Sequence, residues 1–88
     1  MTKVDYSKSY IKALRKSPKN IKIAFRSRLA LYLKDKYHPL LNNHALAGKY
    51  QGHRSINVTG DWRAIFREFD NGNTVYFDEI GTHGQLYR

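Results

Sequence analysis

The segment from residue 44 to residue 87 holds most of the side chains that could do chemistry. Basic residues, histidines and aromatic residues alternate there on three short strand-like runs separated by turn signals. Imidazole can accept or donate a proton near neutral pH because its unperturbed pKa is about 6.5. The planar guanidinium of arginine can bind two phosphate oxygens at once. These residue types are suited to acid–base chemistry at a phosphate group.

Charge and composition narrow the partner. Sixteen Lys and Arg residues stand against seven Asp and Glu residues, for a formal net charge of +9 in 88 residues. Such an excess predicts a polyanionic partner, with nucleic acid ahead of an acidic protein. The chain has no cysteine, which excludes a disulfide framework, a thiolate metal site and a cysteine nucleophile. No pair of histidines has the helical i, i+4 spacing of a metal site, so no metal and no cofactor is expected.

The turns predict how the runs pair. A three-residue loop over residues 59–61 would place Asn57 opposite Arg63. Asn71-Gly72 is a strong two-residue hairpin signal, because both central positions of that turn favour positive φ. That turn would place Arg67 opposite Tyr76 and Arg63 opposite Ile80. The segment is therefore expected to form a three-stranded antiparallel meander.

Side chains alternate between the two faces of a sheet, so the register sorts them. One face is predicted to be the core, with Ile56, Val58, Trp62, Ala64, Phe66, Val75 and Phe77. The other face is the candidate working surface, with Ser55, Asn57, Arg63, Ile65, Arg67, Tyr76, Asp78 and Ile80.

The first half of the chain is predicted to be a scaffold. A short strand over residues 3–6 is followed by a helix from Ser7 or Ser9 to about Lys16. Ser17 as N-cap and Pro18 at the first helical position would start a second helix, which ends near residue 37, before His38-Pro39. Three leucines, Leu40, Leu41 and Leu46, are expected to hold the following loop against the sheet edge.

These elements predict an α+β fold in one domain over residues 1–88. An N-terminal helical hairpin would cover one face of a small, mainly antiparallel, twisted sheet. The first ten residues lack an apolar signal-peptide core and no long apolar run follows, so we expect a cytoplasmic protein with no membrane contact.

Four motifs in the second half carry a family resemblance. They are H-x-L-x-G from His44, G-x-R-S from Gly52, D-W-R-x-I-F from Asp61 and I-G-T-H-x-x-L-Y ending at Tyr87. In this order, after two helices, they resemble the RelE superfamily of bacterial toxin–antitoxin toxins, most closely its YafQ branch. The resemblance implies a small basic α+β domain that cuts mRNA in the ribosomal decoding site without a metal. It also implies mRNA, the ribosome and a cognate antitoxin as partners.

The resemblance assigns roles by position. It implies that His83 is the general acid, Arg63 binds the scissile phosphate, and His44 or Asp61 is the general base, in a cleavage that uses the neighbouring 2′-hydroxyl as nucleophile. The terminal aromatic, Tyr87, completes the catalytic set and could stack on a base. The residues expected to bind RNA are Lys49, His53, Arg54, Asn57, Trp62 and Arg67.

The chain departs from the YafQ pattern at two positions. Asn57 stands where YafQ-like toxins have a histidine, and Glu79 or Ile80 stands where they have an arginine. These departures motivate one alternative function, an RNA-binding or antitoxin-binding module with impaired catalysis. A second alternative is a ParE-like poison of DNA gyrase, which shares the fold but performs no chemistry.

Individual residues have structural alternatives too. Arg63 could pair with Asp78, its diagonal neighbour in the predicted register. Aspartate is common in turns for backbone reasons, so Asp61 need not be catalytic. Trp62 falls on the core face and Tyr87 could cap the core.

Overall fold

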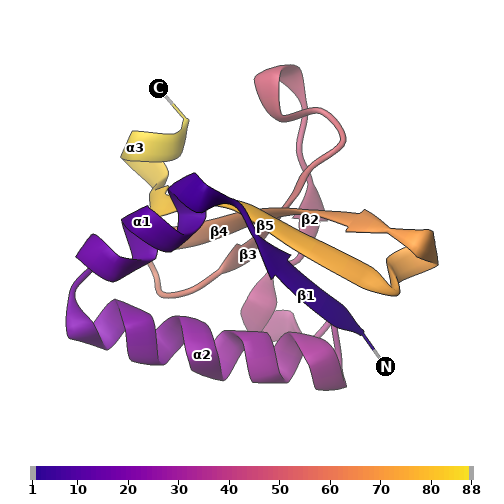
Figure 1. Cartoon of the computed structure of the whole chain (residues 1–88), viewed down its shortest axis with the longest axis horizontal. Helices are drawn as coiled ribbons and strands as arrows, with labels where there is room; N and C mark the ends of the chain where they lie inside the picture. Colours follow the sequence, from indigo (N-terminus) through magenta and orange to yellow (C-terminus); the bar gives the residue numbers. More distant parts are fainter. Residues whose placement is uncertain (1, 88) are drawn as a thin grey trace.

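The computed structural model describes residues 2–87, which form a mixed five-stranded sheet with helices on both sides (Figure 1). Its strands and helices are β1 (Lys3–Tyr6), α1 (Lys8–Lys16), α2 (Lys19–Lys34), β2 (His44–Ala45), β3 (Arg54–Asn57), β4 (Trp62–Phe69), β5 (Thr74–Thr82) and α3 (His83–Leu86). The strand order is β1-β5-β4-β3-β2, with β1 parallel to β5 and the other pairs antiparallel. The predicted α+β architecture is confirmed.

The helical hairpin begins and ends near the predicted residues, with differences at its caps. Ser7 caps α1 by accepting a hydrogen bond from the Tyr10 N–H at 2.9 Å. Ser17 ends α1, and its hydroxyl donates to the Ala13 carbonyl, so Pro18 rather than Ser17 is the N-cap of α2. Helix α2 ends at Lys34, earlier than predicted. Beyond it, Lys36 is held outside the helix, because its carbonyl accepts from the Asn43 amide and its ammonium lies 3.3 Å from Glu68.

The core lies between the hairpin and one face of the sheet. Aromatic rings dominate it, and Phe25 of α2 meets Phe77 of β5 edge-on with ring centroids 5.1 Å apart. The predicted core face is confirmed, since Ile56, Val58, Ala64, Phe66, Val75 and Phe77 are all buried. Trp62 is half-buried and packs against this cluster.

Both turns give the predicted pairing close to them. Asn57 lies opposite Arg63 and Arg67 lies opposite Tyr76, as expected. The Asn71-Gly72 turn has positive φ at both residues, as its type requires.

A β-bulge then shifts the register along β5. Ile65 pairs with Glu79 and Phe66 pairs with Phe77, so Asp78 has no partner on β4. The prediction that Arg63 pairs with Ile80 is therefore wrong, and Arg63 lies opposite Gly81. Ile80 was assigned to the working face, but the extra residue turns it into the core, where it is only 6% exposed.

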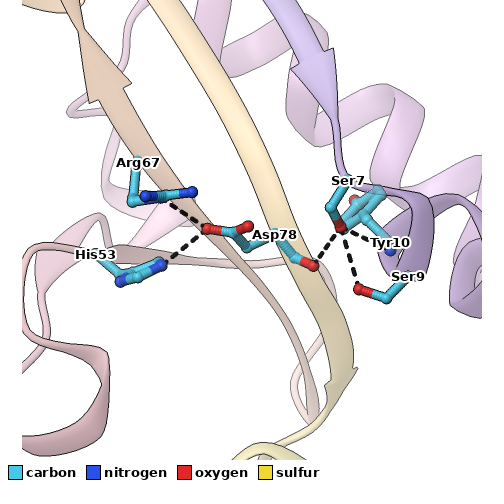
Figure 2. A network of polar contacts seen from close by, with 6 residues as sticks. All are labelled: Ser7, Ser9, Tyr10, His53, Arg67 and Asp78. Atoms are coloured by element: carbon cyan, nitrogen blue, oxygen red, sulfur yellow. Dashed lines mark hydrogen bonds and ion pairs between the residues drawn. The ribbon is translucent and has the colours of Figure 1, made fainter.

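The bulge is tied to the start of α1. The Asp78 carbonyl accepts a hydrogen bond of 2.7 Å from the Ser7 hydroxyl, whose oxygen also caps the helix (Figure 2). The side chain of Asp78 points to the opposite side of β5, toward His53 and Arg67. One serine therefore joins β1, α1 and β5.

The loop after α2 contacts the sheet edge as predicted, but not through every leucine. Leu41 is fully buried, whereas Leu40 is 58% exposed. His44 and Ala45 add a short edge strand to β3, which was not predicted. Among residues 2–87, no helix combines the length and apolar character needed to cross a membrane.

The sheet face away from the hairpin is only partly open. Ile65 at its centre is fully buried, and so is the facing Ser55 of β3. Helix α3 and the segment over residues 46–53 both rise on this side of the sheet (Figure 1). The space between these two segments is where the candidate site lies.

The double role of Ser7 gives a test of the fold. We expect Ser7→Ala to lower the free energy of unfolding by about 1–2 kcal/mol, because it removes the helix cap and the donor to the Asp78 carbonyl. Urea denaturation measures this change. Ser9→Ala is the matched control, because the exposed Ser9 hydroxyl contacts only the Ser7 hydroxyl, at 3.2 Å; equal losses in the two variants would contradict the assignment.

Candidate active site

A hollow of about 340 Å³ brings together residues from three distant parts of the chain. Its lining comprises Asn42, His44, Leu46, Arg63, His83 and Tyr87. Four of the five predicted catalytic residues are therefore neighbours in space, although up to 43 positions separate them in sequence. The histidines are exposed, so a large ligand can reach them.

Arg63 lines this hollow from β4. Its Nη1 atom donates to the carbonyl oxygens of Thr59 and Gly60, each at 3.1 Å, and to that of Trp62 at 3.2 Å. Carbonyls orient the guanidinium without cancelling its charge. No carboxylate of residues 2–87 forms an ion pair with Arg63. The alternative pairing with Asp78 is not found, because Asp78 contacts Arg67 instead.

His44 lies at the rim of the hollow on the edge strand β2. Its Nδ1 atom is 2.7 Å from the Asn42 carbonyl oxygen. A carbonyl can only accept, so Nδ1 carries the proton and Nε2 of the neutral ring keeps a free lone pair. Asn42 adopts the left-handed conformation (φ 47°), which asparagine tolerates better than most residues, and this turn brings its carbonyl to the histidine.

His83 begins α3 and faces the same hollow. The helix has a full capping box, in which Thr82 accepts from the Gln85 N–H and Gln85 accepts from the Thr82 N–H. The His83 N–H donates to the Asp61 carbonyl at 2.9 Å, which ties the helix to the turn before β4. The imidazole lies 4.7 Å from the Tyr87 ring, centroid to centroid.

The side chains of Asp61, Asn57 and Trp62 do not line this hollow. Asp61 is exposed, and only its backbone carbonyl contacts a predicted catalytic residue. Asn57 lies across the ladder from Arg63, with its amide oxygen buried and without a hydrogen-bond partner in the described chain. Glu79 or Ile80 was expected to replace an arginine of YafQ-like toxins. Ile80 lies in the core, so Glu79 is the residue on the sheet face that carries Arg63.

Two other predicted RNA-binding residues are already engaged by an acid. Asp78 Oδ2 lies 2.8 Å from His53 Nε2 and accepts from Arg67 Nε at 2.9 Å (Figure 2). Arg67 also lies near the Phe69 and Tyr76 rings. Lys49 is exposed, with its ammonium 5.1 Å from the centre of the Tyr50 ring.

Arg54 lies away from the hollow and from the Asp78 cluster. Its Nε donates to Asn43 at 2.8 Å, and its guanidinium lies over the Tyr37 ring. This is the side of the sheet where Tyr32 donates to Glu68 at 2.6 Å. Burial opposes ionisation of Glu68, but Tyr32 and Lys36 outweigh it and lower the Glu68 pKa. The structure therefore does not bring Arg54 to the hollow.

Sequence reasoning missed Asn42, Leu46 and Tyr50. Leu46 was treated only as an anchor for the loop, yet it lines the hollow. The Tyr50 ring lies edge-on to Tyr87, with centroids 5.9 Å apart. Burial raises the pKa of Tyr50 to about 12, and the neighbouring Glu79 carboxylate adds to the shift. No periodicity marks these residues, because they lie in irregular segments.

The remaining hollows offer less chemistry. A larger groove between α1 and α2 is mostly apolar and contains no histidine or carboxylate. Within residues 2–87, no three His, Asp or Glu residues gather in a way that could hold a metal ion.

Comparisons with known proteins give a family match and several similar folds. The family described as "Bacterial toxin of type II toxin-antitoxin system, YafQ" matches residues 2–88. Among solved structures, YafQ from E. coli strain BL21(DE3) is similar with a TM-score of 0.82 and 20% identity, covering 100% of both chains. The YoeB/ParE toxin from Agrobacterium tumefaciens has a TM-score of 0.77 and 14% identity, covering 93% of this chain and 99% of its own.

A chain of the E. coli DinJ-YafQ complex is also similar, with a TM-score of 0.72 and 22% identity over 100% of both chains. At these identities the solved structures share the fold, whereas the family match covers nearly the whole sequence. No curated protein sequence matches at a significant level. The chain therefore belongs to the YafQ family of bacterial type II toxin–antitoxin toxins.

Proposed function

We propose that this toxin is an endoribonuclease that cleaves mRNA on the ribosome, without a metal, by attack of the neighbouring 2′-hydroxyl. One observation carries the proposal. An arginine with no carboxylate partner among residues 2–87 lies in the same hollow as two exposed histidines. This set provides the cation and the two proton-transfer groups that the reaction requires.

His44 is the general base in this proposal. Its Nδ1 proton is engaged by the Asn42 carbonyl, so Nε2 is available to take the proton of the 2′-hydroxyl. The 2′-oxygen then forms a bond to phosphorus. Asp61, the other candidate base, is a weaker choice because its carboxylate does not line the hollow.

Arg63 stabilises the charge that develops on the phosphate. Three backbone carbonyls hold its Nη1, so the guanidinium is oriented before the substrate arrives. Preorganised cations of this kind lower the barrier more than mobile ones, since no reorientation is needed as the charge develops.

His83 is the general acid. As the bond between phosphorus and the 5′-oxygen breaks, a protonated imidazole gives its proton to that oxygen, leaving a 2′,3′-cyclic phosphate and a 5′-hydroxyl. Tyr87 packs against the imidazole and is placed to stack on a base beside it. Asp61 positions His83 through its carbonyl.

The partners follow from the charge and the site. The net charge of +9 favours ribosomal RNA and mRNA through counterion release, which gives affinity without sequence choice. Lys49 and Trp62 are proposed to contact the RNA near the hollow. Relatives crystallise as a DinJ-YafQ toxin–antitoxin complex, and we propose that an acidic antitoxin likewise covers the hollow of this toxin in the cytoplasm.

Primer extension on translated mRNA tests the function as a whole. Cuts at fixed codon positions support the nuclease. Arrested translation without cuts would indicate the impaired binding module, and gyrase-linked DNA breaks would indicate the ParE-like alternative; either result would reject the proposal.

Substitution of Arg63 tests whether one placed charge matters. We expect Arg63→Ala to slow cutting by about 10²–10³-fold, because the phosphate loses its preorganised cation. Arg67→Ala removes the same charge from a residue already paired with Asp78 and should have a smaller effect. Single-turnover cleavage rates compare the two; equal losses would mean that charge acts diffusely.

Substitution of His83 separates catalysis from antitoxin binding. His83→Ala should relieve growth arrest and slow cutting by about 10²–10⁴-fold, the usual contribution of a proton-transfer group. Its affinity for the antitoxin should stay close to that of the wild type, as measured by calorimetry. Full toxicity in this variant would remove His83 from the mechanism.

The departure at Asn57 predicts a gain of activity. The family resemblance places a histidine there, and Asn57 lies directly across from Arg63. We expect Asn57→His to raise the cleavage rate by about tenfold or more, because it adds a proton-transfer group beside the phosphate. Asn57→Gln, which adds bulk but no titratable group, should not raise the rate; a gain in both variants would point to packing instead.

A further inference from the structure

A second hollow, of about 420 Å³, lies beside the candidate active site. Its walls include Lys49, Tyr50, His53, Arg67, Asp78 and Glu79, with Ser9 contributed by α1. The Tyr50 ring lies between the two hollows, since it lines this one and contacts Tyr87 of the other. A strand of RNA held at Arg63 could therefore place a neighbouring nucleotide in the second hollow.

Arg67 and His53, on the walls of this hollow, are not free to bind a phosphate. Asp78 takes both Arg67 and His53 through a single carboxylate oxygen, at 2.9 and 2.8 Å (Figure 2). The side chains of Asp78 and His53 are only 19% and 20% exposed, whereas that of Arg67 is 40% exposed. A phosphate would have to compete with a carboxylate that is already well placed between Arg67 and His53.

Glu79 is the carboxylate of this hollow that is not engaged by Arg67 or His53. It forms no ion pair within the described part of the chain, and it lies beside the Tyr50 hydroxyl. Glu79 is oriented to this face by its pairing with Ile65 of β4. An ionised carboxylate can only accept hydrogen bonds, so its partner in a ligand must be a donor.

The lining as a whole mixes donors, acceptors and an aromatic ring. Two carboxylates disfavour an anion, and the nearby Lys49 and Arg67 disfavour a cation. A neutral, planar heterocycle that carries both donors and acceptors fits this balance, and such a ring can also pack against tyrosine. Nucleobases have these properties.

We propose that this second hollow binds the nucleobase adjacent to the cleaved phosphodiester and that Glu79 selects bases with an amino group. The proposal rests on the nuclease function proposed above. Adenine, cytosine and guanine offer an exocyclic amino group to the carboxylate, whereas uracil has none. Lys49 at the rim is then available for the phosphate that follows this base. Glu79 is thus a specificity-determining residue and takes no part in proton transfer.

The test compares cut-site profiles on translated mRNA. The 5′ ends of the products are sequenced for the wild type, Glu79→Gln and Asp35→Asn. At one position flanking the cut, the wild type should favour amino-bearing bases over uracil by about tenfold. Glu79→Gln should reduce this preference to within about twofold, because the amide replaces one acceptor by a donor. Asp35→Asn removes the same charge at the exposed end of α2 and should keep the wild-type profile.

Each outcome supports or overturns the base site. A wild-type profile in Glu79→Gln overturns the base site, and so does a loss of all cutting in that variant with an unchanged melting temperature, which would place Glu79 in the chemistry. Arg63-dependent cuts with no base preference in the wild type overturn the base site alone, whereas an absence of cuts by the wild type overturns the nuclease proposal with it. If Glu79→Gln does not fold, Glu79→Asp replaces it in the test. Its carboxylate is shorter by one methylene, so the preference for amino-bearing bases should become weaker. An unchanged cut-site profile in Glu79→Asp would reject the base site.

Discussion

The β-bulge at Asp78 determines which side chains meet in this protein. With one extra residue in β5, Phe77 and Ile80 both point into the core although they are three positions apart. The same shift puts Gly81 opposite Arg63. A Cβ at Gly81 would lie 3.0 Å from Gln85 Oε1 and 3.5 Å from Leu86, so the glycine lets α3 fold back against the strand. His83, the first residue of α3, reaches the hollow because the helix folds back against β5 in this way.

The bulge also connects the scaffold to the two hollows. Its backbone carbonyl is satisfied by Ser7, which caps α1, and its side chain gathers His53 and Arg67 on the other side of the strand. His53 in turn lies against Tyr50, and Tyr50 lies against Tyr87. The segment over residues 46–53 makes four backbone hydrogen bonds within itself, and the contact between His53 and Asp78 ties it to β5.

The sequence predicts the parts of this arrangement that depend on local patterns. Alternation and the two turns place Asn57, Arg63 and Tyr76 correctly, because a turn fixes the register of the residues next to it. The motif resemblance selected four of the residues that line the hollow. The bulge was not predictable in the same way, since Asp78 has no glycine or proline beside it and the donor to its carbonyl is a serine 71 positions away in sequence. The contacts of Arg54 and Arg67 likewise depend on tertiary neighbours that alternation does not specify.

Net charge overstates the positive charge available at the candidate site. Arg67 and His53 share one carboxylate, and Arg54 lies on the far side of the sheet, so they add little to the field at the hollow. Many other cations lie on α1 and α2, where they are mostly exposed and do not line the hollow. Exposed charges of this kind act through a screened, diffuse field, which favours association with a polyanion without orienting it. Orientation must come from a cation that is fixed but not neutralised. Arg63 meets this condition, because backbone carbonyls restrain its guanidinium and no carboxylate of residues 2–87 pairs with it.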